Sequence, residues 1–322
     1  MRTPFIEFLR EHSRFVILSH VDPDGDAIGS ALGLAWILRD AGKSAQVLLP
    51  GGTPELYAFL TGADDIGAVA ADANLTDAAV IAVDATSPSR LGELASLLER
   101  GRPVANVDHH GDNARFGDVD LVDSSACATA LILWEVAGDA GFRVSKAAAE
   151  NLYAGVLTDT GRFSYTNTDQ RTLQAAAELA GAGAEPFTIA NAVYGTRTIA
   201  SVRLLGRALE TLDLREGGTV ASIHVTQAML RETGATQEDA EGFSSWPRSL
   251  AGVKVGIFLR ETEDGMIKIS FRSSEGVQID GVAGRFGGGG HPSASGARIS
   301  GSIEEAKQAV LQAVSEHLRS TV

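Results

Sequence analysis

Residues Ser19–Ser30 read S-H-V-D-P-D-G-D-A-I-G-S, and this stretch decides how the first half of the chain is interpreted. It follows an apolar run, Phe15–Ser19, that is typical of a buried strand, and it leads into a helical pattern over Ala27–Asp40. One imidazole and three carboxylates lie in the seven residues from His20 to Asp26. Because carboxylates at that density repel one another, the pattern indicates a divalent cation. Mixed His and Asp ligands suit Mn²⁺, with Zn²⁺, Fe²⁺ or Co²⁺ as alternatives and Mg²⁺ less suited.

Two other interpretations of this acidic loop compete with a metal site. Asp26 could be the N-cap of the following helix, with the other acids solvated in a turn. The loop could also be similar to an EF-hand, but its Asp and Gly spacing does not continue to a glutamate at the twelfth position. The density of acidic residues favours the metal site over both.

Short apolar runs alternate with helical patterns along the first half of the chain, which is the order of an α/β domain. The strands predicted after the first one are Ala45–Leu49, Ala79–Val83 and Val104–Val107. The helices predicted after Ala27–Asp40 are Ser89–Arg100 with Gly101 as its C-cap, Ala126–Ala137, Lys146–Thr158 and Arg171–Ala180. This order predicts a mostly parallel β-sheet flanked by helices.

A different pattern begins in the second half. Residues Phe187–Leu214 read as helical with a break near Gly195, and three predicted strands follow at Val220–Val225, Val253–Arg260 and Met266–Arg272. Ser302 starts the last predicted helix and forms a capping box with Glu305. We therefore expect three parts, which are a first domain over 1–187, a helical connector over 188–215 and a smaller α+β domain over 216–322.

The composition limits the partners and the compartment. The chain has 322 residues and a formal net charge of −14, which argues against a protein that coats long DNA or RNA. A short anionic substrate is compatible with this charge, because a site can be locally positive on an acidic protein. The single cysteine, Cys127, excludes a disulfide within the chain and favours a reducing compartment. Since no secretory signal or membrane span is visible, we expect a cytoplasmic protein that does not bind membranes.

Three more acidic or histidine-containing motifs lie at the ends of predicted elements. Asp84 follows one predicted strand, Asp108-His109-His110 follows the next, and Asp159 ends a predicted helix. Each could separately be a cap or a surface turn. Because the carboxyl ends of parallel strands meet at one edge of a sheet, we expect the strand-end motifs to converge with the acidic loop. An acid at a helix C-terminus opposes the helix dipole, which is a further sign of a nearby cation.

The run Gly287-Gly288-Gly289-Gly290-His291 is the remaining motif with a chemical interpretation. Glycine lets the backbone approach a ligand closely, and backbone N–H groups in such a loop can hold a phosphate. A flexible loop is the alternative. His291 and the P-S-A-S-G that follows it favour the binding role.

These motifs, in this order, resemble those of the DHH phosphoesterase family. Its N-terminal domain is similar to H-V-D-P-D-G-D-A-I-G-S at 20–30, V-D-A at 83–85, D-H-H at 108–110 and G-V-L-T-D-T-G-R-F at 155–163. The associated DHHA1 domain resembles G-R-F-G-G-G-G-H-P-S-A-S-G at 284–296. In length and layout the chain resembles the NrnA-type oligoribonucleases, which also dephosphorylate 3′-phosphoadenosine 5′-phosphate, and the related stand-alone cyclic-di-AMP phosphodiesterases.

The resemblance implies a centre of two divalent ions, Mn²⁺ in the first place, with Mg²⁺ or Co²⁺ as alternatives. Six side chains would hold them: His20, Asp24, Asp26, Asp84, His109 and Asp159. In the family pattern the first two bind one ion, Asp26, His109 and Asp159 bind the other, and Asp84 bridges both. Two such ions roughly 3.5–4 Å apart activate a water for attack on phosphorus and stabilise the charge that develops on its oxygens.

Other residues would orient ligands or hold the substrate. Asp108 would fix the orientation of a histidine, and His110 would lie near the substrate phosphate. Arg272-Ser273 resembles the family's substrate-gripping segment, and arginine suits bidentate contact with phosphate. Arg285 is a weaker match and could be a solvated helix residue. The resemblance places the active site in the cleft between the two domains, with the glycine loop and His291 opposite the metals.

The resemblance also implies the reaction. It predicts a phosphoesterase that hydrolyses very short RNA to mononucleotides, or 3′-phosphoadenosine 5′-phosphate to AMP. Cyclic-di-AMP and linear dinucleotides such as pApA or pGpG are alternative substrates for the same chemistry. A RecJ-type DNA exonuclease fits less well because the chain is short and acidic, and a manganese pyrophosphatase fits less well because of the glycine-histidine motif. A non-catalytic nucleotide sensor is the alternative from another class. The oligomeric state stays open, with a homodimer as one option.

Overall fold

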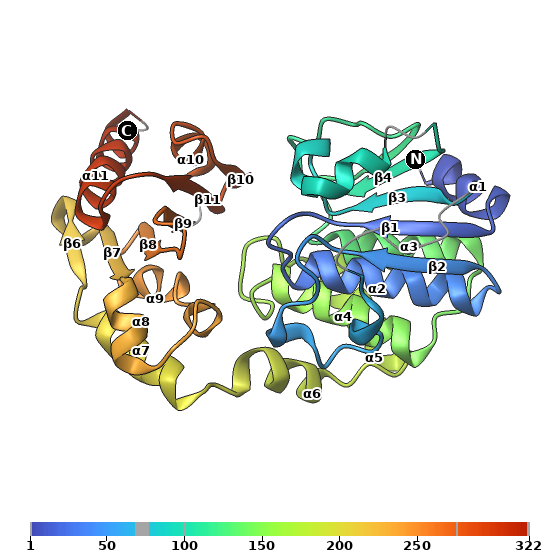
Figure 1. The fold of residues 1–322 in the computed structure, drawn as a ribbon, viewed down its shortest axis with the longest axis horizontal. Coiled ribbons are helices and arrows are strands. Elements are labelled where there is room, and N and C mark those ends of the chain that lie inside the picture. The colour runs from blue at the N-terminus through green and yellow to red at the C-terminus, as the bar shows by residue number, and fades with distance from the viewer. Residues whose placement is uncertain (1, 68–76, 99–100, 275, 321–322) are drawn as a thin grey trace. The chain divides into compact units, whose positions relative to one another are not determined.

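The structure is a computed structural model that describes residues 2–67, 77–98, 101–274 and 276–320 (Figure 1). The chain forms two compact units, Met1–Thr196 and Arg197–Val322, each with its own sheet and apolar core. A parallel α/β unit together with a smaller second sheet unit confirms the predicted fold class. Within the described ranges, no helix combines the length and the apolar character that crossing a membrane requires.

The first unit is built on a five-stranded parallel sheet in the order β2-β1-β3-β4-β5. Its strands are β1 (Arg14–Leu18), β2 (Ser44–Leu48), β3 (Ala79–Val83), β4 (Val104–Asp108) and β5 (Val119–Val122). The sequence pattern predicts the first four but not β5, an edge strand in which only Leu121 is buried. Because β1 pairs with both β2 and β3, the loop after β1 lies where the strand order reverses, which is the ligand-binding position of open α/β sheets.

Helices pack around this sheet: α1 (Thr3–Glu11), α2 (Gly25–Asp40), α3 (Thr129–Ala140), α4 (Lys146–Asp159), α5 (Gln170–Gly181) and α6 (Pro186–Ala190), then a π-helical turn, η5 (Asn191–Gly195). The α-helix predicted over Ser89–Arg100 is wrong, because the segment is a 3₁₀ helix, η4 (Pro88–Leu97). Gly92 interrupts it at φ 56° and ψ −133°, which no α-helix accommodates. Residues 99–100 of that prediction lie outside the described residues.

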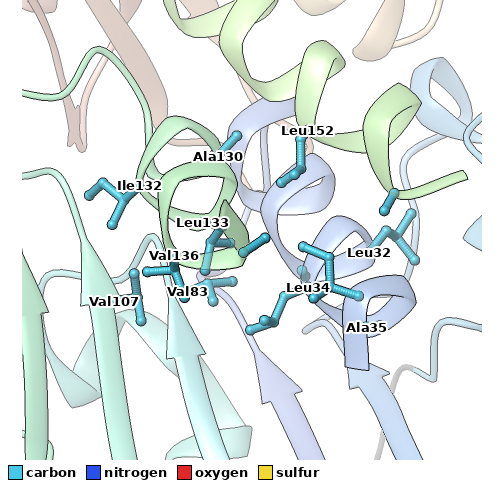
Figure 2. Close-up of a cluster of buried hydrophobic side chains, with 14 of the residues drawn as sticks. Leu32, Leu34, Ala35, Val83, Val107, Ala130, Ile132, Leu133, Val136 and Leu152 are labelled. Carbon is cyan, nitrogen blue, oxygen red and sulfur yellow. The ribbon is translucent and has the colours of Figure 1, made fainter. Parts of the chain in front are cut away.

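The core of the first unit lies between the sheet and its helices. In Figure 2, Leu133 and Val136 of α3 lie beside Val83 and Val107 of the sheet, and all four belong to one buried cluster. Leu34 of α2 fills the same layer. This apolar layer ends where the strands end, and polar side chains take over there.

Three glycines spaced four residues apart form the face of α2 that meets α4. A Cβ atom at Gly29 would lie 2.4 Å from the backbone oxygen of Asn151, and one at Gly25 would lie 2.4 Å from Thr158 Oγ1. Gly33 would meet α4 in the same way, through Leu152. Only glycine permits so close an approach, which brings the N-terminus of α2 beside the C-terminus of α4.

The second unit holds a six-stranded mixed sheet in the order β10-β11-β9-β8-β7-β6, in which β7 and β8 are parallel. Its strands are β6 (Asp213–Arg215), β7 (Val220–Val225), β8 (Val255–Glu261), β9 (Ile267–Ser273), β10 (Gly289–His291) and β11 (Ala294–Ile299). Its helices are α7 (Ile199–Leu209), α8 (Gln227–Thr233), α9 (Ser245–Arg248), α10 (Asp280–Gly284) and α11 (Ile303–Ser320).

The structure tests two sequence predictions in the second unit, the capping box of the last helix and the glycine run. The capping box of the last helix is confirmed, since Ser302 N–H donates to Glu305 Oε2 at 2.9 Å and Glu305 N–H donates to Ser302 Oγ at 3.3 Å. The end of the glycine run is strand β10 rather than a free loop, because Gly289–His291 pair with β11. The boundary between the units, after Thr196, lies in the stretch expected to be a helical connector, and residues 213–215 of that stretch form β6.

Candidate metal centre

The acidic loop joins the carboxyl end of β1 to the N-terminus of α2. Ser19 Oγ donates a hydrogen bond of 2.8 Å to the backbone oxygen of Val83, which ties the loop to β3. Asp24 is the N-cap of α2, because its Oδ1 accepts from the N–H groups of Asp26 and Ala27 at 3.0 and 3.1 Å. The alternative with Asp26 as the N-cap is therefore wrong. Asp26 lies in the first turn of the helix, where its side chain is buried.

Asp84 is shared by two groups of candidate ligand atoms. Atoms of His20, Asp24 and Asp84 lie within 4.8 Å of one another, and so do atoms of Asp26, Asp84 and His109. Asp84 Oδ2 lies 3.5 Å from His20 Nε2, whereas Asp84 Oδ1 lies 3.5 Å from His109 Nε2. The two oxygens of one carboxylate thus face two different histidines, which is the arrangement that a ligand bridging two cations needs.

Asp159 joins the second of these groups from the end of α4. Its Oδ2 lies 3.8 Å from His109 Nε2, the same distance that separates Asp26 Oδ2 from that nitrogen. The close approach of α2 and α4 is what brings Asp26 and Asp159 to the same histidine. The six side chains predicted as metal ligands therefore lie in one cluster at the carboxyl edge of the first sheet.

The backbone of Asp84 is itself unusual. Its φ is +53°, in the left-handed region that side chains other than glycine, asparagine and aspartate rarely adopt. The turn after β3 therefore requires one of these few residue types at the position shared by both ligand groups.

Positively charged side chains neutralise the carboxylates of this cluster only in part. Burial, followed by the negative charge of Asp84, raises the pKa of Asp26 well above its usual range. Burial also opposes the ionisation of Asp84, but the hydrogen bond from His20 and the charges of His110 and His109 prevail and lower its pKa. Among the described residues, no lysine or arginine lies within 4 Å of either carboxylate. Divalent cations fit this set of nitrogen and oxygen donors and would supply the missing positive charge.

The same carboxylates also shift the pKa values of two histidines. Burial lowers the pKa of His20, but the hydrogen bond to Asp84 and the charges of Asp24 and Asp84 outweigh it, so the pKa is raised overall. Burial lowers the pKa of His110 too, but its hydrogen bond to Asp108 and the charge of Asp84 raise it to about 10. In the metal-free chain His110 is therefore a cation at neutral pH, next to an acidic cluster.

Asp108 organises the loop after β4. Its Oδ1 accepts from the N–H groups of His109 and His110 at 2.8 and 3.2 Å, and it lies 2.7 Å from His110 Nδ1. Asn113 Nδ2 donates to the other oxygen at 2.6 Å. Asn113 is a site residue that sequence reasoning misses, because an asparagine in a turn carries no signal of its own and its role depends on the shape of the loop.

The second unit carries the residues predicted to hold the substrate. Arg272 and Ser273 end β9, and the last glycines of the run form β10 with His291. Ala294 of β11 pairs with His291 on one side and with Arg272 on the other, so these two residues flank it across three adjacent strands. Arg272 Nη1 donates to the backbone oxygen of Phe271 at 2.9 Å, and its Nε is buried with no hydrogen-bond partner among the described residues.

Arg285 has a different setting from Arg272. It lies at the end of α10, where its Nη1 is 3.3 Å from Glu316 Oε2 of α11, and both side chains are about half exposed. This ion pair on the surface is the environment expected for a solvated helix residue.

Two family models match this chain, one within each of the two structural units. Residues 14–156 match the DHH family, N-terminal domain, and residues 220–320 match the DHHA1 domain. A protein of Thermus thermophilus named bifunctional oligoribonuclease and PAP phosphatase NrnA is 36% identical, over 94% of this chain and 89% of that protein. A protein of the same name from Bacillus subtilis is 31% identical, over 93% of each. A solved structure of an exopolyphosphatase-related protein from Bacteroides fragilis is similar with a TM-score of 0.91 at 29% identity, over 99% of this chain and 97% of that one.

The fold, the clustered ligand atoms and these relatives define an enzyme that hydrolyses phosphoester bonds. More particularly, the chain belongs to the DHH family and carries a DHHA1 domain, which confirms the resemblance carried by the sequence motifs.

Proposed function

We propose that this enzyme degrades short oligoribonucleotides to mononucleotides and converts 3′-phosphoadenosine 5′-phosphate to AMP, with two Mn²⁺ ions as cofactors. The observation that carries the proposal is the shared carboxylate, because Asp84 offers one oxygen to the side of His20 and the other to the side of His109. The substrate class is supported by the names of two relatives that match this chain over 89% and 93% of their lengths.

Each ion would have its own ligand set. One would be held by His20, Asp24 and Asp84, and the other by Asp26, Asp84, His109 and Asp159. Once bound, the two ions would supply Lewis acidity toward an attacking water and toward the phosphoryl oxygens. Two further side chains, which would not bind the ions, would orient the site and the substrate. Asp108 would orient His110, whose Nδ1 lies 2.7 Å from Asp108 Oδ1, and His110 would lie near the substrate phosphate.

We assign hydrolysis to a catalytic domain over 1–187 and the holding of substrate to a domain over 216–322, joined by 188–215. Arg272 presents a planar guanidinium that suits a phosphate, and His291 lies in register with it across β11. Gly288, Gly289 and Gly290 would add backbone N–H groups, since β10 is an edge strand of the sheet. Ser273 would support this segment, whereas the ion pair of Arg285 with Glu316 gives that arginine a smaller part.

A panel of substrates tests the proposal. Purified protein with Mn²⁺ is incubated separately with 3′-phosphoadenosine 5′-phosphate, a labelled RNA of two to five nucleotides, cyclic-di-AMP and long single-stranded DNA, with chelator-treated protein as the control. We expect phosphate from the first, mononucleotides from the second and little product from the DNA, because the chain is acidic. Turnover of cyclic-di-AMP alone would overturn the substrate class and retain the site. Absence of turnover with all four substrates would contradict the proposed activity and favour a non-catalytic nucleotide sensor.

A further inference from the structure

Thr129 begins α3 and is fully buried in the first unit. The first N–H groups of a helix have no partner within the helix, and Ala128, which precedes α3, has no side chain that could cap them. A carboxylate from another helix takes that place. Thr129 N–H donates to Asp26 Oδ2 at 2.6 Å, and Ala130 N–H donates to Asp26 Oδ1 at 3.0 Å. The start of α3 therefore fixes the position of Asp26.

The hydroxyl of Thr129 reaches the other buried carboxylate. Thr129 Oγ1 donates to Asp84 Oδ1 at 3.1 Å. The two oxygens that Thr129 contacts, Asp26 Oδ2 and Asp84 Oδ1, are also the ones that lie 3.8 and 3.5 Å from His109 Nε2. One residue thus touches both carboxylates of the group that His109 completes.

We infer that Thr129 is a positioning residue for the ion that Asp26, Asp84 and His109 would share, since it binds Asp26 with its backbone N–H and Asp84 with its hydroxyl. The inference rests on the proposed function and deepens it. A carboxylate oxygen accepts a hydrogen bond with one lone pair and can offer the other to a cation, so Thr129 needs no contact with the ion. Removing groups that orient ligands in this way changes metal affinity or activity by roughly 10–100-fold.

Removing the hydroxyl of Thr129 tests its contact with Asp84 alone, because other groups keep Asp26 in place. Ser30 Oγ donates to Asp26 Oδ1 at 2.9 Å, and the backbone N–H groups at the start of α3 bind Asp26 whatever side chain follows them. Replacing Thr129 by valine keeps the size and branching of the side chain and leaves Asp26 anchored. It removes only the hydrogen bond that fixes the Oδ1 atom of Asp84.

The experiment combines calorimetry with kinetics. Mn²⁺ is titrated into metal-free wild-type protein and the Thr129→Val variant, and kcat and KM are measured on the substrate that the wild type turns over. We expect one Mn²⁺ to bind about 10–100-fold more weakly in Thr129→Val, with kcat lowered to a similar extent and KM little changed. Thr129→Ser restores the hydroxyl and should recover most of both losses.

A second buried threonine provides the matched control. Thr172 Oγ1 donates to Asp169 Oδ1 at 2.8 Å, outside the cluster, so Thr172→Val loses a similar hydrogen bond and should keep both Mn²⁺ affinities. Wild-type Mn²⁺ binding in Thr129→Val would overturn the inference, and so would equal binding by Thr129→Ser and Thr129→Ala, which differ only in the hydroxyl. The comparison of Thr129→Ser with Thr129→Ala also tests the inference if Thr129→Val does not fold. Failure of the wild-type protein to bind two Mn²⁺ ions would instead overturn the proposed function.

Discussion

The acidic edge of the first unit (His20–Asp26, Asp84, His109 and Asp159) and the glycine edge of the second unit (Gly287–His291) use opposite physical means. At the acidic edge, the side chains of His20, Asp26, Asp84 and His109 are all buried, and neighbouring groups hold their orientations. At the glycine edge, Gly289 and Gly290 are exposed, and the backbone itself is the available polar group. The first unit therefore fixes its charges before anything binds, whereas the second exposes backbone groups that carry no side chains.

Asp84→Asn should have the largest effect, because it removes the charge that both ligand groups share. We expect turnover to fall by about 10³-fold or more, while asparagine tolerates the left-handed backbone and keeps the fold. Turnover in saturating Mn²⁺ and thermal unfolding would be measured side by side. Asp139→Asn is the control, since that carboxylate is about half exposed and pairs with Arg2. Full activity of Asp84→Asn in added Mn²⁺ would remove Asp84 from the metal centre.

Gly29→Ala and Gly206→Ala should change stability in opposite directions. A Cβ at Gly29 meets backbone atoms of α4 at 2.4 and 2.9 Å, so the two helices must separate, and we expect the free energy of unfolding to fall by about 1–3 kcal/mol. Gly206 lies inside α7, and outside that helix's own backbone no described residue lies within 4 Å of a Cβ there, so alanine should raise that energy by about 0.5–1 kcal/mol. Urea denaturation would measure both. A Gly29→Ala variant as stable as the wild type would contradict the tight contact between α2 and α4.

Arg272→Ala should affect substrate binding more than turnover. If the second unit holds the substrate, KM should rise about 10-fold, equivalent to 1.4 kcal/mol, with kcat nearly unchanged. Arg298→Ala on β11 is the control, because that exposed arginine pairs with Asp264 at 2.9 Å. A fall in kcat at constant KM would instead give Arg272 a part in the reaction and would weaken the comparison between the two edges.

A smaller effect is expected at His224 of β7. Burial, followed by the charge of Lys307, lowers the pKa of His224 below its ordinary 6.5. As the pH falls below 6.5, the unfolded chain takes up a proton before the folded chain does, so the free energy of unfolding should decrease. Urea denaturation of metal-free protein at pH 7 and pH 5 should show a smaller decrease for His224→Gln than for the wild type. Equal decreases would mean that His224 does not contribute.

Regular spacing allows much of the fold and cluster to be predicted from the sequence. Four strands of the first unit follow from their apolar runs, and parallel strands that end at one edge explain why Asp84 and His109 meet the acidic loop. The same spacing cannot distinguish η4 from an α-helix, because a single glycine conformation decides between them.

The remaining features depend on contacts between distant parts of the chain. Thr129 bonds to Asp26 across 103 residues, and nothing near either residue in the sequence announces that contact. Asp24 rather than Asp26 caps α2, and the carboxylate of Asp26 instead accepts from the first N–H groups of α3. Similarly, the glycine run gives no sign that its end pairs with β11, since glycine has little preference for strands.

The glycine face of α2 has a consequence for how the first unit opens. Because backbone of α2 lies against backbone of α4, neither helix can unwind without releasing the other. Amide hydrogens in the two helices should therefore exchange with solvent in one cooperative step, with similar protection along both. The residues at their meeting ends, Asp26 and Asp159, would then lose their shared geometry in that same event, so that opening of this helix pair and loss of bound metal would have a common rate.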